Sequence, residues 1–231
     1  QQLFDQANSE YVKKNYSVAI HDYEQLIHKY GASPALFYNL ALAYAKADHP
    51  GKAILNLERA HTLAPGDKEI TALLTEFRKK EGLFVSPPKG LEKVAALLEI
   101  DQWAWLGLTS LLLFTSLFLF SSFAKGKRTR WLIGIQNGSL LAAILFFSAV
   151  IYLWDDANPA IITTENGRLL ISPIAEADLV VSLRQGQKVF PIKSHDRYLY
   201  VRDHNNKKGW ISSNSLEAVN TPKKWAAQEM P

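Results

Sequence analysis

Two long stretches of the chain carry no charged residue. They run from Trp103 to Ala124 and from Trp131 to Trp154. A helix needs about 20 apolar residues to cross the roughly 30 Å hydrocarbon core of a bilayer, and both stretches exceed that length. The pattern therefore predicts an integral membrane protein with transmembrane helices at 103–124 and 131–154, joined by a cytoplasmic loop at 125–130. Neither helix contains Asp, Glu, Lys, Arg or His, which argues against an ion or proton pathway.

The surplus of positive charge lies in this short loop. Residues 1–102 carry 12 Lys and Arg against 13 Asp and Glu, and residues 155–231 carry 10 against 9, although the whole chain has a formal net charge of +4. Lys and Arg in short loops stay on the cytoplasmic side of a membrane, which places the loop there. Because the flanking regions lack a basic surplus, we expect no nucleic-acid binding. The basic residues of the loop, which set the topology, are Lys125, Lys127, Arg128 and Arg130.

This orientation puts the two flanking regions in the same outer compartment. We expect a two-pass protein of the inner (cytoplasmic) membrane with both termini in the periplasm. An exported N-terminal region needs a signal peptide, and the chain opens Gln1-Gln2 without an apolar leader, so we expect that a leader has been removed. The chain has no cysteine, which excludes cysteine catalysis, c-type haem attachment and thiolate metal sites.

Region 1–81 has the pattern of an all-α tetratricopeptide-repeat domain. Residues Pro34 to Asp67 form one helix-turn-helix unit of 34 residues, the length of that repeat. A shift of 34 residues places a weaker first repeat at Leu3 to Ala32, and Asp67 to Lys80 supplies a further helix. The positions that carry the pattern are Phe37, Leu40, Ala41, Tyr44, Ala53, Leu57, Ala60 and Pro65. Such stacks need about three repeats for a continuous core, so this one is expected to lean on a partner.

The first helices of such repeats line a concave surface. One interpretation is a groove that binds an apolar peptide segment or a helix of a periplasmic partner protein. The other is an ordinary concave surface with a few exposed rings, and the sequence leaves both open. The residues predicted to face the groove are Phe4, Asn8, Tyr11, Tyr38, Leu42, Lys46, Glu76 and Lys79.

Residues 82–102 are predicted to form a linker followed by an interfacial helix. Gly82, Gly90 and the Pro87-Pro88 pair interrupt helix at the start of this segment. Apolar residues then recur at helical spacing, as in a helix lying on a membrane surface. The alternative is a simple extension of the first transmembrane helix. The apolar positions are Leu91, Val94, Ala95 and Leu98.

The second transmembrane stretch contains small and amide side chains. Small residues allow close helix contact, and amides in hydrocarbon seek hydrogen bonds from a neighbouring helix. One interpretation, which the sequence favours, is that the two transmembrane helices pack on each other there. The other docks the hairpin onto another membrane subunit. The residues predicted for this helix packing are Gly134, Gln136, Asn137 and Gly138.

Residues 160–219 consist of short β-rich runs, and 220–231 form a tail. The runs are Ala160–Thr164, Arg168–Ser172, Leu179–Leu183, Lys188–Lys193, Tyr198–Arg202 and Gly209–Ser212, with turn residues between them. The order of signals, with Gly209-Trp210-Ile211 as the most specific, is similar to the bacterial SH3 domain, a small all-β barrel. That resemblance implies binding of peptidoglycan or short peptides through Tyr198, Tyr200 and Trp210. The alternative, which the sequence favours, is that Tyr200 and Trp210 fill the core of the barrel.

The sequence offers no catalytic motif. It has no phosphate loop, no His-Glu-x-x-His, no nucleophile elbow and no dinucleotide fingerprint. The pairs His195-Asp196 and Asp203-His204 lack the third cluster that a metal site needs, and exposed hairpin ends explain them. We therefore expect no enzyme, no metal and no cofactor.

The whole order of modules, repeats, transmembrane hairpin and SH3-like domain, resembles the BatE family of the Bacteroides aerotolerance operon. Local matches are Tyr38-Asn39-Leu40, Gly51-Lys52-Ala53-Ile54, Leu57-Glu58-Arg59-Ala60 and Glu99-Ile100-Asp101. The resemblance implies an envelope assembly with other Bat-type subunits, among them membrane proteins with von Willebrand A domains, and indirectly with a MoxR-type ATPase. We expect a non-catalytic scaffold in the bilayer. The alternative is a cell-wall tether or sensor that reads peptidoglycan.

Overall fold

The computed structural model describes residues 2–83, 94, 97–98, 100–123, 130–154 and 158–220. The chain divides into two compact units. The first contains the described residues of Gln1–Val85 and Asn158–Pro231, and the second those of Ser86–Ala157. The helices that precede the apolar stretches and the strands that follow them thus belong to one unit. The predicted interfacial helix and the loop residues Lys125, Lys127 and Arg128 fall largely or wholly outside the described residues.

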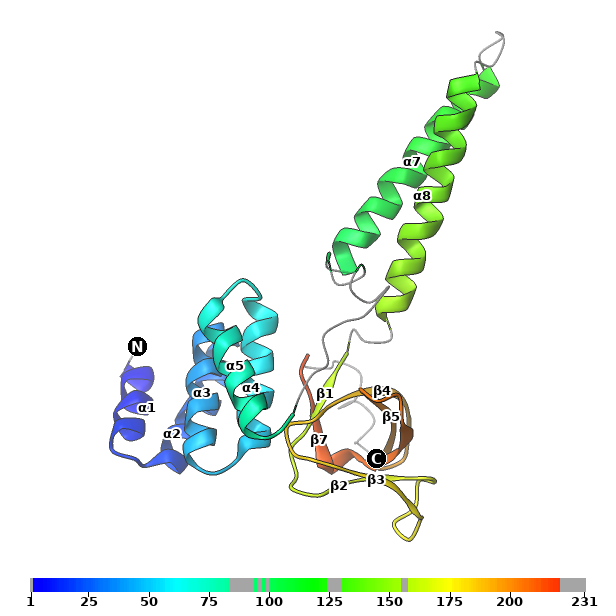
Figure 1. Cartoon of the computed structure of the whole chain (residues 1–231). Coiled ribbons are helices and arrows are strands. Elements are labelled where there is room, and N and C mark those ends of the chain that lie inside the picture. The colour runs from blue at the N-terminus through cyan, green and yellow to red at the C-terminus, as the bar shows by residue number, and fades with distance from the viewer. Residues whose placement is uncertain are drawn as a thin grey trace. The chain divides into compact units, whose positions relative to one another are not determined.

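Five helices form the N-terminal part of the first unit (Figure 1). They are α1 (Gln2–Val12), α2 (Tyr16–Tyr30), α3 (Pro34–Lys46), α4 (Pro50–Leu63) and α5 (Lys68–Lys80). Ser33 caps α3, where its hydroxyl accepts from the Leu36 amide at 3.2 Å and Pro34 opens the first turn. Asp67 caps α5 in the same way through the amides of Glu69 and Ile70.

The helices meet through small side chains. Ala41, Ala53 and Ala60, the positions predicted for close helix contact, are all buried. A core forms around Tyr23, Leu26, Leu40 and Tyr44 with the alanines of α1, α2 and α4. An all-helical N-terminal region is therefore confirmed.

The C-terminal part of the first unit is a seven-stranded antiparallel sheet (Figure 1). Its order is β3-β2-β6-β5-β4-β1-β7. The strands predicted from alternation are confirmed, and one short strand, β7, was missed. The strands are β1 (Ala160–Ile162), β2 (Gly167–Leu170), β3 (Leu179–Leu183), β4 (Lys188–His195), β5 (Tyr198–Asp203), β6 (Lys208–Ser212) and β7 (Leu216–Ala218).

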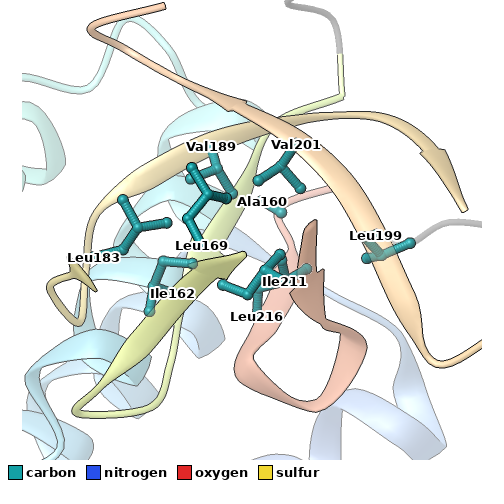
Figure 2. Close-up of a cluster of buried hydrophobic side chains, with 9 residues drawn as sticks. All are labelled: Ala160, Ile162, Leu169, Leu183, Val189, Leu199, Val201, Ile211 and Leu216. Atoms are coloured by element: carbon teal, nitrogen blue, oxygen red, sulfur yellow. The ribbon is translucent and has the colours of Figure 1, made fainter. Parts of the chain in front are cut away.

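Aliphatic side chains fill the interior enclosed by these strands (Figure 2). Strand β5 shows the alternation that separates the two faces of the sheet: Leu199 and Val201 are buried, whereas Tyr198, Tyr200 and Arg202 between them are partly exposed. The core consists of Ala160, Ile162, Leu169, Leu183, Val189, Leu199, Val201, Ile211 and Leu216.

A third core joins the sheet to the helices. Ile161 of β1 and Val219 lie in one cluster with Ile54, Leu55 and Leu57 of α4. Helix α4 carries apolar side chains on more than one side, which explains why its second side is covered by strands. The sequence-based description as two separate modules did not foresee this shared core.

Helices α7 (Ile100–Phe123) and α8 (Arg130–Trp154) form the second unit. Ile100–Ser122 and Trp131–Leu153 are each 23 residues long and apolar enough to cross a membrane. At 1.5 Å per residue each span covers about 34 Å, enough for a hydrocarbon core of about 30 Å. Two helices suited to a two-pass membrane protein are thus present. Arg130, predicted to lie in the loop, is the first residue of α8.

The two helices pack on each other, but away from the glycine pair predicted for this contact. A side chain added at Gly107 of α7 would meet the ring of Phe147 at 3.2 Å, and Trp103 contacts Phe146 with ring centroids 5.7 Å apart. A side chain added at Gly134 or Gly138 would meet nothing within 4 Å. The expectation that these glycines lie between α7 and α8 was wrong, because both are on the exposed side of α8.

Candidate interaction surfaces

The eight predicted groove residues come from α1, α3 and α5. Half of them already pack against, or hydrogen-bond to, neighbouring helices of the same region. Phe4 and Tyr11 pack against the core around Tyr23. The Tyr23 hydroxyl donates to Asn8 at 2.6 Å. These side chains stabilise the contact between α1 and α2, so they are less free for a ligand than the sequence suggested.

Tyr38 links α3 to α5. Its ring packs against two buried clusters, and its hydroxyl donates to the Glu69 carboxylate at 2.7 Å. This hydrogen bond, together with burial, raises the pKa of Tyr38 to about 12. A charged residue at this position would therefore disturb the fold as well as any groove.

The remaining predicted groove residues are more accessible. Leu42 is half-buried, and Lys46, Glu76 and Lys79 are exposed. Glu76 and Lys79 line a shallow hollow on the outer side of α5 with residues of the same helix and the preceding turn, including Thr71, Ala72 and Thr75. No residue of α1 or α3 takes part in this hollow. Of the eight predicted residues, this hollow brings together Glu76 and Lys79.

Tyr23 and Tyr38 are expected to make the stability of the fold depend on pH in the alkaline range. Burial raises the pKa of Tyr23 to about 12, as the bond to Glu69 does for Tyr38, from an ordinary value of 10.0. A raised folded-state pKa means that the stabilisation is complete below pH 10.0 and is lost as the pH rises through about 12. Tyrosinate absorbance should show two groups titrating near pH 12, and Tyr38→Phe should remove one of them. An unchanged titration in Tyr38→Phe would contradict this assignment.

Tyr200 and Trp210 lie on the outer face of the sheet. They are cross-strand partners of β5 and β6, with ring centroids 5.1 Å apart, and both are partly exposed. The neighbouring residues Val201 and Ile211 occupy the core instead. The expectation that Tyr200 and Trp210 fill the core was therefore wrong, and the face with Tyr198 is the one open to a ligand.

Cations lie over the rings of this face. The Lys193 ammonium is 5.1 Å from the centroid of Tyr200 and 5.3 Å from that of Trp210. The Arg202 guanidinium lies 4.9 Å from the Phe190 ring. The sequence analysis missed Lys193 and Arg202, although the alternation of Tyr198, Tyr200 and Arg202 along β5 was a usable signal for Arg202.

The two His-Asp pairs do not meet. Asp203 is buried on the core side of β5 and accepts from the Lys207 amide at 2.8 Å. His195 stands at the other end of the β4–β5 ladder, paired with Tyr198. Among the described residues no group of three or more His, Asp or Glu is placed to hold a metal ion.

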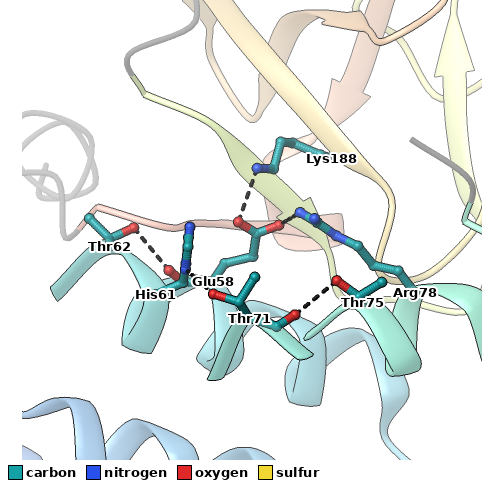
Figure 3. A network of polar contacts seen from close by, with 7 residues as sticks. All are labelled: Glu58, His61, Thr62, Thr71, Thr75, Arg78 and Lys188. Carbon is teal, nitrogen blue, oxygen red and sulfur yellow. Dashed lines mark hydrogen bonds and ion pairs between the residues drawn. The ribbon is translucent and has the colours of Figure 1, made fainter. Parts of the chain in front are cut away.

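A charged network connects the helices to the sheet (Figure 3). The buried carboxylate of Glu58 on α4 accepts from Arg78 of α5 and from the Lys188 ammonium of β4 at 3.0 Å. Burial lowers the pKa of Arg78, but its guanidinium stays charged because the ordinary value is far above neutral pH. The network holds α4, α5 and β4 in one arrangement.

A second polar link lies beside it. Arg59 of α4 donates to the carbonyl oxygen of Ala218 at 2.9 Å and pairs with Glu217 of β7 at 3.5 Å. The sequence analysis used Glu58 and Arg59 only as part of a local match to the BatE family. Their burial next to strands more than 100 residues away leaves no local signal in the sequence.

Comparison with known proteins gives no family. No protein-family model matches the chain, and no curated protein matches it significantly. The functional argument therefore depends on the surfaces described above.

Proposed function

We propose that the chain is a non-catalytic scaffold subunit of a bacterial envelope membrane complex of the Bat type. The observation that carries this proposal is the exposed small and polar surface of α8. Gly134, Asn137 and Gly138 are exposed there, although they belong to a helix that is otherwise strongly apolar. An amide facing hydrocarbon seeks a partner from another helix, and α7 packs elsewhere. A helix of another membrane subunit could pack closely on the glycines and supply a hydrogen-bonding partner for the amide.

The helical region is best described as tetratricopeptide repeats. Residues separated by the 34-residue repeat length occupy equivalent buried positions: Ala7 matches Ala41, and Ala19 matches Ala53. This equivalence supports two complete repeats, followed by α5 in the position of the first helix of a third repeat. Leu42 and Lys46 remain accessible on α3 for a periplasmic partner.

The sheet is best described as a bacterial SH3-like barrel. A side chain added at Gly209 would lie 2.7 Å from Leu169 Cγ and 2.8 Å from the Leu170 carbonyl oxygen. Glycine is thus required where β6 crosses β2, and the next residue, Trp210, turns outward. This geometry supports the assignment that the Gly-Trp pair suggested.

The shared core supports a hairpin topology. Ile161 and Val219, which follow the apolar helices in sequence, pack with α4, which precedes them. Regions that share a core occupy the same compartment, so the chain between them crosses the membrane an even number of times. We place both termini in the periplasm and the loop with Arg128 in the cytoplasm, in agreement with its positive charge.

Partners follow from the resemblance to the BatE family. Membrane proteins with von Willebrand A domains would bind α8, and a MoxR-type ATPase would act on the assembly from the cytoplasm. The aerotolerance role of that operon would then be a property of the whole assembly.

Co-purification tests this proposal. Extraction of the chain, tagged after Pro231, from native membranes in mild detergent should recover stoichiometric membrane proteins. Gly138→Leu should release them without disturbing the hairpin, since nothing lies within 4 Å of a Cβ atom added at this position. Ser148→Leu, a small-to-large change at another exposed position about 15 Å further along α8, should retain them if the contact is local to the glycine pair. Elution of the unmodified chain alone would contradict the proposal.

A second candidate function is a cell-wall tether or sensor. It is favoured by the outward orientation of Tyr200 and Trp210. Sedimentation of the whole detergent-solubilised protein with purified sacculi, lost in Trp210→Ala, would support it. The whole chain is needed because Ile161 packs against the helices, so an isolated sheet would lack part of its environment. Absence of sedimentation would exclude this candidate.

A further inference from the structure

One face of the sheet combines aromatic rings with positive charge. Strands β4, β5 and β6 place cross-strand rows on this face, among them Lys193 with Tyr200 and Trp210. The only acidic residue in these strands is Asp203, which is buried on the opposite face, and Asp196 in the turn between β4 and β5 lies 3.7 Å from His195 at the edge of the face. We call this surface the aromatic–basic face. It consists of Phe190, Lys193, His195, Tyr198, Tyr200, Arg202, Lys208 and Trp210.

A short connection joins the sheet to α8. Only residues 155–159 separate the end of α8 at Trp154 from the start of β1 at Ala160. Fully extended, that connection reaches about 20 Å. Ala160 pairs with Val189 of β4, and successive strands are about 5 Å apart. If α8 spans the membrane, as proposed above, the connection tethers the start of β1 within about 20 Å of the end of that helix.

From these two observations we propose that the aromatic–basic face binds anionic lipid headgroups. Lys193, Arg202 and Lys208 supply the positive charge that lipid phosphates attract, and Trp and Tyr rings are the side chains preferred at the headgroup level of a bilayer. The cations over the rings keep apolar and charged groups in one layer, as the interface requires. The face would hold the first unit against the membrane from which it is tethered.

The absence of cysteine allows a direct test in the whole chain. Ser212→Cys places a polarity-sensitive fluorophore on the face, because Ser212 is the cross-strand partner of Tyr198. Ser182→Cys on β3, which is exposed, is the matched position away from it. Leu141→Cys on α8 reports on membrane insertion. The labelled proteins are reconstituted in nanodiscs of phosphatidylcholine, with or without phosphatidylglycerol.

We expect the Ser212 label to become shielded from water when phosphatidylglycerol is present, whereas the Ser182 label stays exposed. Each Lys or Arg side chain near an anionic membrane surface changes the equilibrium between the membrane-bound and the unbound state of the face by about fivefold. Lys193→Gln should therefore shift that equilibrium toward the unbound state by about this factor, and about 1 M salt should abolish the shielding.

Three results would overturn the proposal. A water-exposed Ser212 label in anionic discs, beside an embedded Leu141 label, contradicts lipid binding and leaves the membrane placement intact. A water-exposed Leu141 label refutes the membrane placement and the lipid proposal with it. Shielding in neutral discs only after addition of peptidoglycan fragments would assign the face to the cell wall instead.

Discussion

Replacing Glu58 with glutamine is expected to lower the free energy of unfolding of the helices and the sheet together by about 3–5 kcal/mol, the usual cost of breaking a buried ion pair. The Glu58 side chain is 5% exposed and is shared by Arg78 and Lys188. Glutamine keeps the shape but removes the negative charge. The Arg78 guanidinium would then remain partly buried without a counter-charge.

The measurement is urea unfolding in a mild detergent. Far-UV ellipticity follows the helices, and a fluorophore on Ser212→Cys follows the sheet. Because the network joins α4, α5 and β4, both signals should shift to lower urea by the same amount. Glu76→Gln, at an exposed site of α5, is the control and should change the stability by less than about 0.5 kcal/mol. A similarly small effect of Glu58→Gln would show that the network contributes little.

Gly51→Ala tests the packing of α4 against the sheet. In an isolated helix this change would stabilise by up to about 1 kcal/mol, because alanine has the higher helix propensity. In the folded chain the added Cβ would lie 2.8 Å from the Ile162 carbonyl oxygen and 3.2 Å from Thr163 Cα. Backbone atoms move reluctantly, so we expect a net destabilisation of about 1–3 kcal/mol, as for other overpacked sites.

Gly66→Ala is the matched control for that substitution. A Cβ at Gly66 would have nothing within 4 Å. Its effect should be neutral or stabilising by about 0.4–1 kcal/mol, through the reduced entropy of the unfolded chain. Thermal unfolding in detergent measures both variants. A Gly51→Ala protein as stable as the unmodified one would mean that the helices and the sheet do not pack as described.

Much of the fold was predictable from periodicity. The apolar stretches gave α7 and α8 directly, because no water-exposed helix tolerates such a run of apolar residues. Alternation gave the strand at Tyr198–Arg202, and residue spacing gave the helix pairs of the N-terminal region. Strand β7, Leu216–Ala218, is only three residues long and its Leu-Glu-Ala sequence has none of the β-branched or aromatic residues that mark strands such as β1.

The interaction surfaces were less predictable, because they depend on contacts between distant residues. The bond from Tyr38 to Glu69 spans 31 positions, and the contact of Lys188 with Glu58 spans 130. Alternation in Gly209-Trp210-Ile211 shows that Trp210 and Ile211 face opposite sides, but only the register decides which side is the core. The sequence therefore allowed Trp210 to be assigned to the wrong face.

The same limit applies to the membrane helices. Gly134 and Gly138 have the spacing of a helix-packing motif, but spacing does not say which helix they meet. The contact between α7 and α8 uses Gly107 and Phe147 instead. The exposed face with Gly134 and Gly138 is the basis for proposing a partner subunit.

The central claim is that the helices and the sheet form one body on one side of the membrane. Single cysteines at Ser17 on α2, Ser182 on β3 and Thr129 between the apolar helices test it with a membrane-impermeant maleimide on intact spheroplasts. The first two positions are exposed and should both react from outside, whereas Thr129→Cys should react only after the membrane is opened. Reaction of the Ser17 and Ser182 positions from opposite sides would contradict the shared core and the topology built on it.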